Sequence, residues 1–256
     1  MSVFSNFKCT MMLSLQTRSP SFSLIFSPFK HYSPLFKSKP RFSTIRMSSS
    51  QSVVEHVVLV KVKDGTEPSK VSAMVNAMNS LASIDGVLQL TAGPLLRNGP
   101  TTAFTHMLHS RYHSKDHLQA YNVHPSHLAA VTGFLFPVCE DIMVVDWVGA
   151  KTTLNPSATG SGLRVRFLKL KGGGGDDHDE IKVKDEVLSV VRGMKEGVGE
   201  LSYGENFSPE RAKGFSIASL SIFPGRKELE SVNLEEGLVK VGEHVEDAIV
   251  VDYVVP

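Results

Sequence analysis

A nine-residue segment near the middle of this 256-residue chain returns near its end, and this repeat limits the possible folds more than any other feature. Residues 140–148 read EDIMVVDWV and residues 246–254 read EDAIVVDYV, identical at six of nine positions. A repeat of this length predicts two copies of one structural unit. We therefore expect one copy at 53–150, a second at 161–256, and a polar linker with Pro and Gly at 151–160.

Within the first copy, the spacing of apolar residues changes repeatedly between that of a strand and that of a helix. The expected elements are a strand at 53–63, a helix with an apolar stripe from Val71 to Leu81, strands at 87–90 and 102–112, a second helix that begins at Ser114 and is interrupted at Pro125, and a strand at 142–148. This βαββαβ order is that of a ferredoxin-like unit. Its sheet carries helices on one side only, and two copies can bury both bare faces by packing sheet to sheet. We therefore expect an α+β fold in which two ferredoxin-like repeats pair as an intrachain α+β barrel.

The first 52 residues differ in composition from the rest of the chain. They hold 14 serines, four prolines and seven basic residues, but no acid, since the first carboxylate is Glu55. This composition is typical of a plastid transit peptide and predicts import into the chloroplast. A start of translation at Met47 would instead predict the cytosol or the peroxisome, and a disordered tail without a targeting role is the alternative to both.

Charge, apolar runs and cysteines exclude several classes of function. Without the first 52 residues, the chain carries 20 basic against 26 acidic residues, so we expect no binding to nucleic acid. No apolar run approaches the roughly 18 residues needed to span a membrane, so we expect no membrane span. The only cysteines are Cys9 and Cys139, and Cys9 lies in the leader, so the two repeats cannot form a disulfide within themselves.

Several segments of the first copy together resemble a known family. They are EHVVLVK at 55–61, FTH at 104–106, YNVHPSH at 121–127 and VVD at 144–146. Their order resembles that of the stress-responsive dimeric α/β-barrel (Dabb) family, and the two-copy chain is similar to its tandem two-domain plant members. The resemblance implies a ferredoxin-like fold paired into an α+β barrel. The first copy is also similar to olivetolic acid cyclase, a polyketide cyclase.

Four side chains of the first copy are candidates for a site. His56 and His106 lie on apolar strand faces and are expected to point into the space between sheet and helices. Tyr121 and His127 flank Pro125, which redirects the backbone so that both can face the same space. A histidine can remove a proton next to a carbonyl while a phenol stabilises the oxyanion, and this step needs no metal. The resemblance to the cyclase implies that Tyr121 and His127 are this pair and that His56 and His106 shape the ligand pocket; the alternative is that all four only satisfy one another in a packed core.

Other residues of the first copy are expected to have structural places. Thr66 is predicted to cap the first helix, and Phe104 is predicted to share one strand face with His106 and Leu108. The remaining histidines of this copy are expected at the surface: His109, His113, His117 and His124.

The second copy lacks the candidate residues. Its counterparts of His56, His106 and Tyr121 are Arg164, Ile217 and Val232, and no His-Pro-x-His sequence follows. We therefore expect any pocket chemistry to belong to the first copy alone, while the second supplies the other half of the barrel.

The resemblance implies one further site and leaves three functions open. Some plant family members hold a cation on backbone carbonyls where the first helix ends, which here would be Mg²⁺ on Leu81, Ile84 and Val87. The favoured function is a non-catalytic, stress-associated barrel that binds a small apolar ligand or acts through its own stability. The alternatives are a polyketide-cyclase-like enzyme that uses the His/Tyr pair on a polyketide-like ligand, and an assembly module that binds partners or a second copy of the chain.

Overall fold

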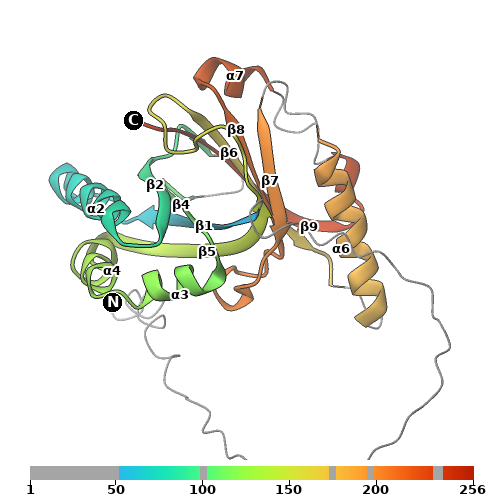
Figure 1. The fold of residues 1–256 in the computed structure, drawn as a ribbon, viewed down its shortest axis with the longest axis horizontal. Coiled ribbons are helices and arrows are strands. Elements are labelled where there is room, and N and C mark those ends of the chain that lie inside the picture. The colour runs from blue at the N-terminus through green and yellow to red at the C-terminus, as the bar shows by residue number, and fades with distance from the viewer. Residues whose placement is uncertain (1–51, 99–102, 173–176, 195–198, 233–238) are drawn as a thin grey trace, which may run out of the picture.

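The computed structural model describes residues 52–98, 103–172, 177–194, 199–232 and 239–256 (Figure 1). The first repeat contains β1 (Ser52–Val62), α2 (Pro68–Ser80), η1 (Leu81–Ser83), β2 (Val87–Pro94), β3 (Arg97–Asn98), β4 (His106–Tyr112), α3 (Lys115–Asn122), α4 (Pro125–Ala130), the π-helical η2 (Val131–Leu135), α5 (Phe136–Val138) and β5 (Cys139–Ala150). The second contains β6 (Gly162–Leu170), α6 (Asp177–Arg192), β7 (Glu200–Glu205), η3 (Pro209–Arg211), β8 (Ile217–Phe223), α7 (Arg226–Ser231), η4 (Val239–Val241) and β9 (Val245–Val254). Both repeats thus follow the predicted βαββαβ order.

Each repeat builds one antiparallel sheet, and the helices lie on the outer faces of the two sheets. The strand order is β2-β4-β1-β5 in the first sheet and β3-β9-β6-β8-β7 in the second. Figure 1 shows α2, α3 and α4 on one side of the molecule and α6 on the opposite side. The predicted α+β class with two paired ferredoxin-like units is therefore confirmed.

The two sheets are joined at both edges, so the strands close into a barrel. At one edge, β3 of the first repeat pairs with β9 and so extends the second sheet. At the other edge, β5 approaches β7, and Trp147 forms a β-bridge with Asn206. A Cβ at Gly204 would lie 2.7 Å from the carbonyl oxygen of Val148, so this close approach requires glycine. Closure removes the exposed sheet edges that two separate ferredoxin-like units would have.

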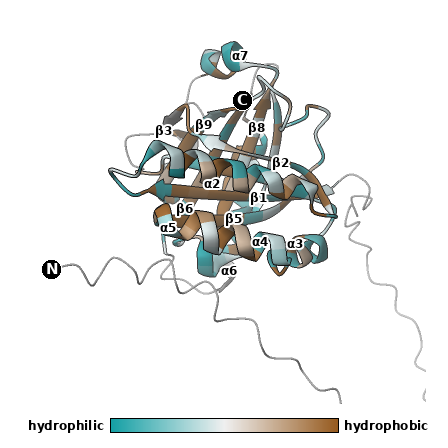
Figure 2. Cartoon of the chain, turned by 90° about the vertical axis from the view of Figure 1, so that its left-hand side faces the viewer, coloured by the Kyte–Doolittle hydropathy of each residue, from teal (hydrophilic) through white to brown (hydrophobic). Residues whose placement is uncertain are grey.

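The central strand of the first sheet is buried on both faces. Val57 and Leu59 pack against the second sheet in the barrel core, whereas Val58 and Val60 pack beneath the helices. Side chains alternate across a strand, which is why neighbouring residues of β1 belong to two different cores. Figure 2 shows hydrophobic residues along β1, consistent with burial from both sides.

The second helical region forms as its sequence predicts. The Ser114 side chain accepts a hydrogen bond from the amide of His117 and caps α3. Helix α3 ends at Asn122 and α4 begins at Pro125, because proline lacks the amide hydrogen that a continuous helix would need. This break turns the chain between the two helices and aims the side chains on either side of it at one space.

Two local predictions for the first repeat are wrong. The cap of α2 is Glu67, which makes no side-chain capping bond, while the hydroxyl of Thr66 donates to the carbonyl of Lys63 over 2.6 Å. Phe104 lies in the barrel core, whereas Leu108 packs beneath the helices. The reason is that β4 begins only at His106, so the alternation of the strand does not extend back to Phe104.

The leader lies outside the described residues except for Ser52, which is the first residue of β1. Segment 151–161 connects the repeats without a helix or strand. None of the helices in the described ranges is long and apolar enough to cross a membrane.

Candidate functional site

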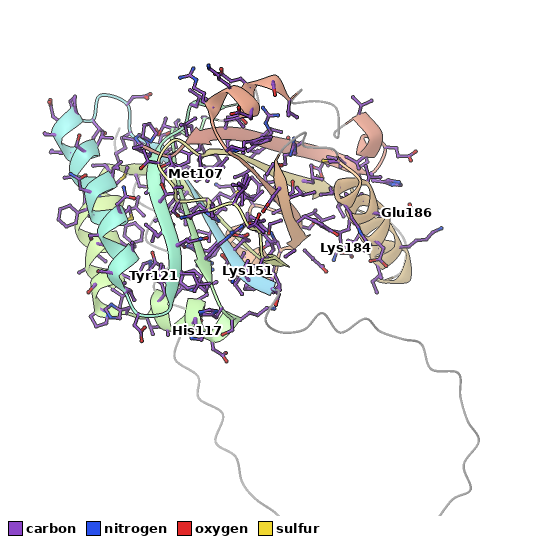
Figure 3. The ribbon with its side chains drawn as sticks, turned by 45° about the horizontal axis from the view of Figure 1, so that its top comes forward. Met107, His117, Tyr121, Lys151, Lys184 and Glu186 are labelled. Atoms are coloured by element: carbon purple, nitrogen blue, oxygen red, sulfur yellow. The ribbon has the colours of Figure 1, made fainter. Side chains whose placement is uncertain are left out.

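A cavity of about 1410 Å³ lies between the first sheet and the helices that cover it. Its walls are largely apolar: Val58, Val60, Met74, Met78, Leu118, Val131, Leu135 and Val144. Figure 3 shows Tyr121 on the helix side of this sheet, away from the barrel interior. The cavity is half-open, and polar and charged side chains line the rest of it. Concave sites with mainly apolar walls and convergent polar groups are typical of small-molecule binding.

All four candidate side chains line this cavity, and three of them lie together. The ring centroids of Tyr121 and His127 are 4.5 Å apart, and those of His56 and Tyr121 are 6.2 Å apart. His106 lies four residues before Ser110, the residue of β4 opposite His56, and its ring hydrogen-bonds Thr105. The structure therefore places His106 at a different part of the cavity wall.

His127 is held as a neutral imidazole with one free acceptor. Its Nδ1 lies 3.0 Å from the carbonyl oxygen of Asn122. Because a carbonyl only accepts, Nδ1 carries the hydrogen and Nε2 keeps its lone pair. Burial, and next the nearby His56, lower the pKa of His127 to about 4. At neutral pH the ring can therefore accept a proton or a hydrogen bond through Nε2.

Tyr121 is the matching donor. Its side chain is buried, and this burial raises the pKa of its hydroxyl above the usual range, against the opposing effect of a hydrogen bond with Tyr112. The hydroxyl of Tyr112 lies 3.0 Å from that of Ser110. Tyr121 therefore remains a neutral phenol that can donate to an oxygen beside His127.

His56 is paired with Asp146, a buried carboxylate that our sequence reasoning did not assign to the site. The Nδ1 of His56 lies 2.6 Å from Oδ1 of Asp146. Burial opposes ionisation of Asp146, but His56, Arg211 and Ser208 together keep its pKa below the usual range. One signal could have identified Asp146: it is the charged residue within a run of apolar strand residues, and it recurs as Asp252 in the second repeat.

The second repeat contributes part of the cavity wall. Phe207, Ser208, Arg211 and Lys213, from the connection between β7 and β8, line the cavity. The hydroxyl of Ser208 and Nη2 of Arg211 lie 2.5 and 2.7 Å from Oδ2 of Asp146. The sequence predicted pocket chemistry in the first copy alone, and that stays a prediction. The cavity wall, however, includes residues of the second copy, because this connection crosses the seam where the two sheets meet.

The corresponding place in the second repeat is filled by an arginine. Arg164 pairs with Asp252 in register, just as His56 pairs with Asp146. Its fully buried guanidinium donates to Asp252 and to the carbonyls of Leu229 and Val232. An arginine has five donors and no acceptor, so this side chain cannot offer a lone pair to a ligand.

His109 is buried, so its predicted place at the surface is wrong. It follows Leu108 on β4 and therefore faces the barrel interior, where its Nε2 lies 2.7 Å from Glu55 and where Arg111 binds the same carboxylate. Burial opposes ionisation of Glu55, but these two partners outweigh it and lower the pKa of Glu55 to about 2. His113 and His117 are exposed, and His124 is half-buried at the start of α4.

The turn after α2 has oxygens that suit the predicted cation. The amides of Ile84 and Val87 donate to the carbonyls of Leu81 and Ile84 over 3.1 and 3.2 Å. A carbonyl oxygen has two lone pairs, so each retains one for a cation. No cluster of three or more His, Cys, Asp or Glu side chains suited to a metal occurs among the residues with described positions. Cation binding at this turn stays a prediction.

Comparisons with known proteins agree with this fold. The family model for the stress responsive A/B barrel domain matches residues 54–149. A stress-response A/B barrel domain-containing protein of Arabidopsis thaliana is 43% identical over 226 residues, which are 84% of this chain and 84% of that protein. A second Arabidopsis protein of the same description is 41% identical over 212 residues, which are 80% of this chain and 98% of that protein. The alignment with a crystal structure from Fusobacterium nucleatum covers 80% of this chain and 93% of that chain, with 11% identity and a TM-score of 0.52. At this identity, the match shows a shared fold alone. This chain belongs to the stress-response A/B barrel family.

Proposed function

We propose that the barrel binds a small, mainly apolar molecule that carries an oxygen atom, in the cavity between the first sheet and its helices. The observation that carries this proposal is the placement of Tyr121 and His127. One offers a hydrogen-bond donor and the other an acceptor, side by side in a wall that is otherwise largely apolar. An oxygen that reaches this pair satisfies both groups, while the rest of the ligand contacts methionine, leucine and valine side chains.

The neutral aromatic alcohol 2-naphthol is a suitable probe, because it combines an apolar body with one hydroxyl. We expect calorimetric titration of the full chain to show binding, and Tyr121→Phe to weaken it about fivefold to tenfold, the effect of one lost hydrogen bond. Tyr253→Phe is the matched control. It removes the same atom from a tyrosine whose hydroxyl contacts Thr91 and which is not part of the cavity wall. Equal affinities of the two variants would contradict a role for Tyr121 in the site.

A second candidate function is proton transfer on a carbonyl compound. The Nε2 of His127 would take a proton from the carbon next to the carbonyl, the electron pair of that bond would form an enolate, and Tyr121 would donate to the enolate oxygen. The free lone pair of His127 is the observation that favours this function.

The ketone 2-tetralone tests proton transfer, because its activated C–H hydrogens exchange with deuterium. We expect the full chain to accelerate this exchange and His127→Ala to reduce the acceleration by about 100-fold or more. With the pKa of His127 at about 4, the rate should fall only as the pH approaches 4, where the base becomes protonated. His113→Ala, which alters an exposed histidine, should have no effect. Exchange no faster than in buffer would contradict the enzymatic function, and it would not affect the proposal of ligand binding.

Three further proposals concern targeting, cation binding and assembly. Residues 1–52 are proposed to direct the chain to the chloroplast, and a fluorescent fusion of this segment that stays in the cytosol would refute this. Mg²⁺ is proposed to bind the carbonyls of Leu81, Ile84 and Val87. Elemental analysis that finds no bound metal after incubation with Mg²⁺ would contradict this site.

The outer helices are proposed to bind partners or a second chain, and a purely monomeric protein in size-exclusion measurements would count against self-association.

A further inference from the structure

The second repeat holds Asp146 of the first repeat through both its main chain and its side chain. The side-chain oxygen of Asn206 accepts from the amide of Asp146, and the amide of Phe207 donates to its carbonyl over 2.9 Å. Ser208 and Arg211 donate to Oδ2 of the carboxylate. All four partners belong to one short connection, so the position and ionisation of Asp146 depend on the other repeat.

This arrangement determines which nitrogen of His56 faces the cavity. With Oδ2 occupied by two donors, Oδ1 is the oxygen that contacts Nδ1 of His56. An ionised carboxylate only accepts hydrogen bonds, so Nδ1 carries a hydrogen, and in the neutral ring Nε2 keeps its lone pair. A neighbouring carboxylate fixes the histidine tautomer in the same way in many metal and catalytic sites.

The second repeat neutralises its equivalent buried aspartate in a different way. Its buried Asp252 is neutralised by Arg164, which comes from the same repeat and occupies the strand position of His56. In the first repeat the arginine on the buried aspartate comes from the opposite repeat. Because Arg211 already neutralises Asp146, the position opposite it on β1 can be occupied by a histidine, which can accept hydrogen bonds as well as donate them.

We propose that Arg211, together with Ser208, is a positioning residue supplied by the second repeat. It keeps Asp146 ionised and so fixes the His56 tautomer that presents an acceptor to the cavity. The second repeat is then a part of the site and not only the other half of the barrel. The preferred ligand carries a hydrogen-bond donor, such as a hydroxyl, that reaches His56. This inference deepens the proposed function, but its main test requires no ligand.

The test is long-range ¹H–¹⁵N NMR of the full chain with labelled histidines, at mildly alkaline pH. His56→Gln assigns the His56 signals. We expect the native chain to show a hydrogen on Nδ1 of His56 and none on Nε2. Arg211→Gln should shift both signals toward a mixture of tautomers, and Arg211→Lys should restore them in part. The matched control is Arg226→Gln, which removes an exposed arginine of the same repeat that pairs with Glu230 and should leave His56 unchanged.

A purely structural role for Arg211 predicts a different result. In that case Arg211→Gln lowers the melting temperature while the His56 signals match those of the control, and the proposal is wrong. If Arg211→Gln does not fold, Ser208→Ala removes one of the same two donors and should shift the His56 signals in the same direction by a smaller amount. Unchanged His56 signals in Ser208→Ala would then overturn the proposal.

A second readout concerns ligand choice. The native chain should bind 2,7-dihydroxynaphthalene about fivefold to tenfold more tightly than 7-methoxy-2-naphthol. Both carry one hydroxyl for Tyr121 and His127, but only the first carries a second donor that can reach His56. Arg211→Gln should reduce this preference to about twofold or less, because His56 then no longer presents a fixed acceptor. An unchanged preference would contradict the role in specificity. If neither compound binds the native chain, the proposed function fails for these probes, whereas the NMR result decides the positioning role independently.

Discussion

Glu55→Ala is expected to lower the free energy of unfolding by about 3–5 kcal/mol, the usual cost of removing one partner from a buried ion pair. The Glu55 side chain is inaccessible to solvent and accepts hydrogen bonds from His109 and Arg111 inside the barrel. Alanine would leave the guanidinium of Arg111 buried without its counter-charge. Urea unfolding followed by circular dichroism measures the effect.

The matched control is Glu140→Ala, which removes a carboxylate from an ion pair on the same sheet. The Lys61–Glu140 pair is partly exposed, with side-chain exposures of 27% and 39%, so its loss should cost only a small fraction of what Glu55→Ala costs. If Glu55→Ala cost no more than this control, the buried cluster would contribute nothing beyond a surface pair.

The same cluster predicts how stability depends on pH. Glu55 has a pKa of about 2 in the folded chain against 4.5 for an unperturbed glutamate. A lowered pKa means that the unfolded chain takes up the proton first, so this contribution is complete above about pH 4.5 and disappears as the pH falls toward 2. The difference corresponds to about 3 kcal/mol. Glu55→Ala should therefore flatten the stability profile over this range, and an equally steep profile in both proteins would contradict the assignment.

Arg164→Ala is expected to destabilise the chain by about 3–5 kcal/mol, because it removes the fully buried guanidinium that pairs with the buried carboxylate of Asp252. The same change also removes the donors to the carbonyls of Leu229 and Val232, which lie where the second repeat would otherwise have its pocket. Guanidinium unfolding is unsuitable for an ionic effect, so urea or thermal unfolding should be used.

His56→Ala is the control at the equivalent strand position. It removes one partner of Asp146 but leaves Arg211 and Ser208 in place, so we expect a loss of about 1–3 kcal/mol, the range for a single hydrogen bond to a charged group. If Arg164→Ala were the milder of the two changes, the two aspartates would not be neutralised in the different ways described above.

The sequence alone predicted the main features of the first repeat. Alternation along β1 and the apolar stripe of α2 follow from local spacing, and the break at Pro125 follows from proline chemistry. It also predicted that the helices and the first sheet enclose the space that His56, Tyr121 and His127 face. The catalytic roles of Tyr121 and His127 stay predictions.

The residues that sequence reasoning misplaced are those whose partners lie far away in the chain. His109 resembles a surface histidine until Glu55, 54 positions earlier, is placed beside it across the β1–β4 pair. Ser208 and Arg211 carry no local signal at all, because they approach Asp146 only when two edge strands from different repeats meet.

By itself, the sequence determined the two repeats, their βαββαβ order and the loss of the histidine cluster from the second, because spacing, proline and residue identity act over a few neighbouring positions. Only the tertiary structure decided how the buried charges are balanced. Packing of the two sheets against each other and against the segments that cover them takes Glu55, Asp146 and Asp252 out of water, and each then needs a cation at hydrogen-bond distance. Where that cation comes from depends on which strands become neighbours, and this puts Arg211 of one repeat into the site of the other.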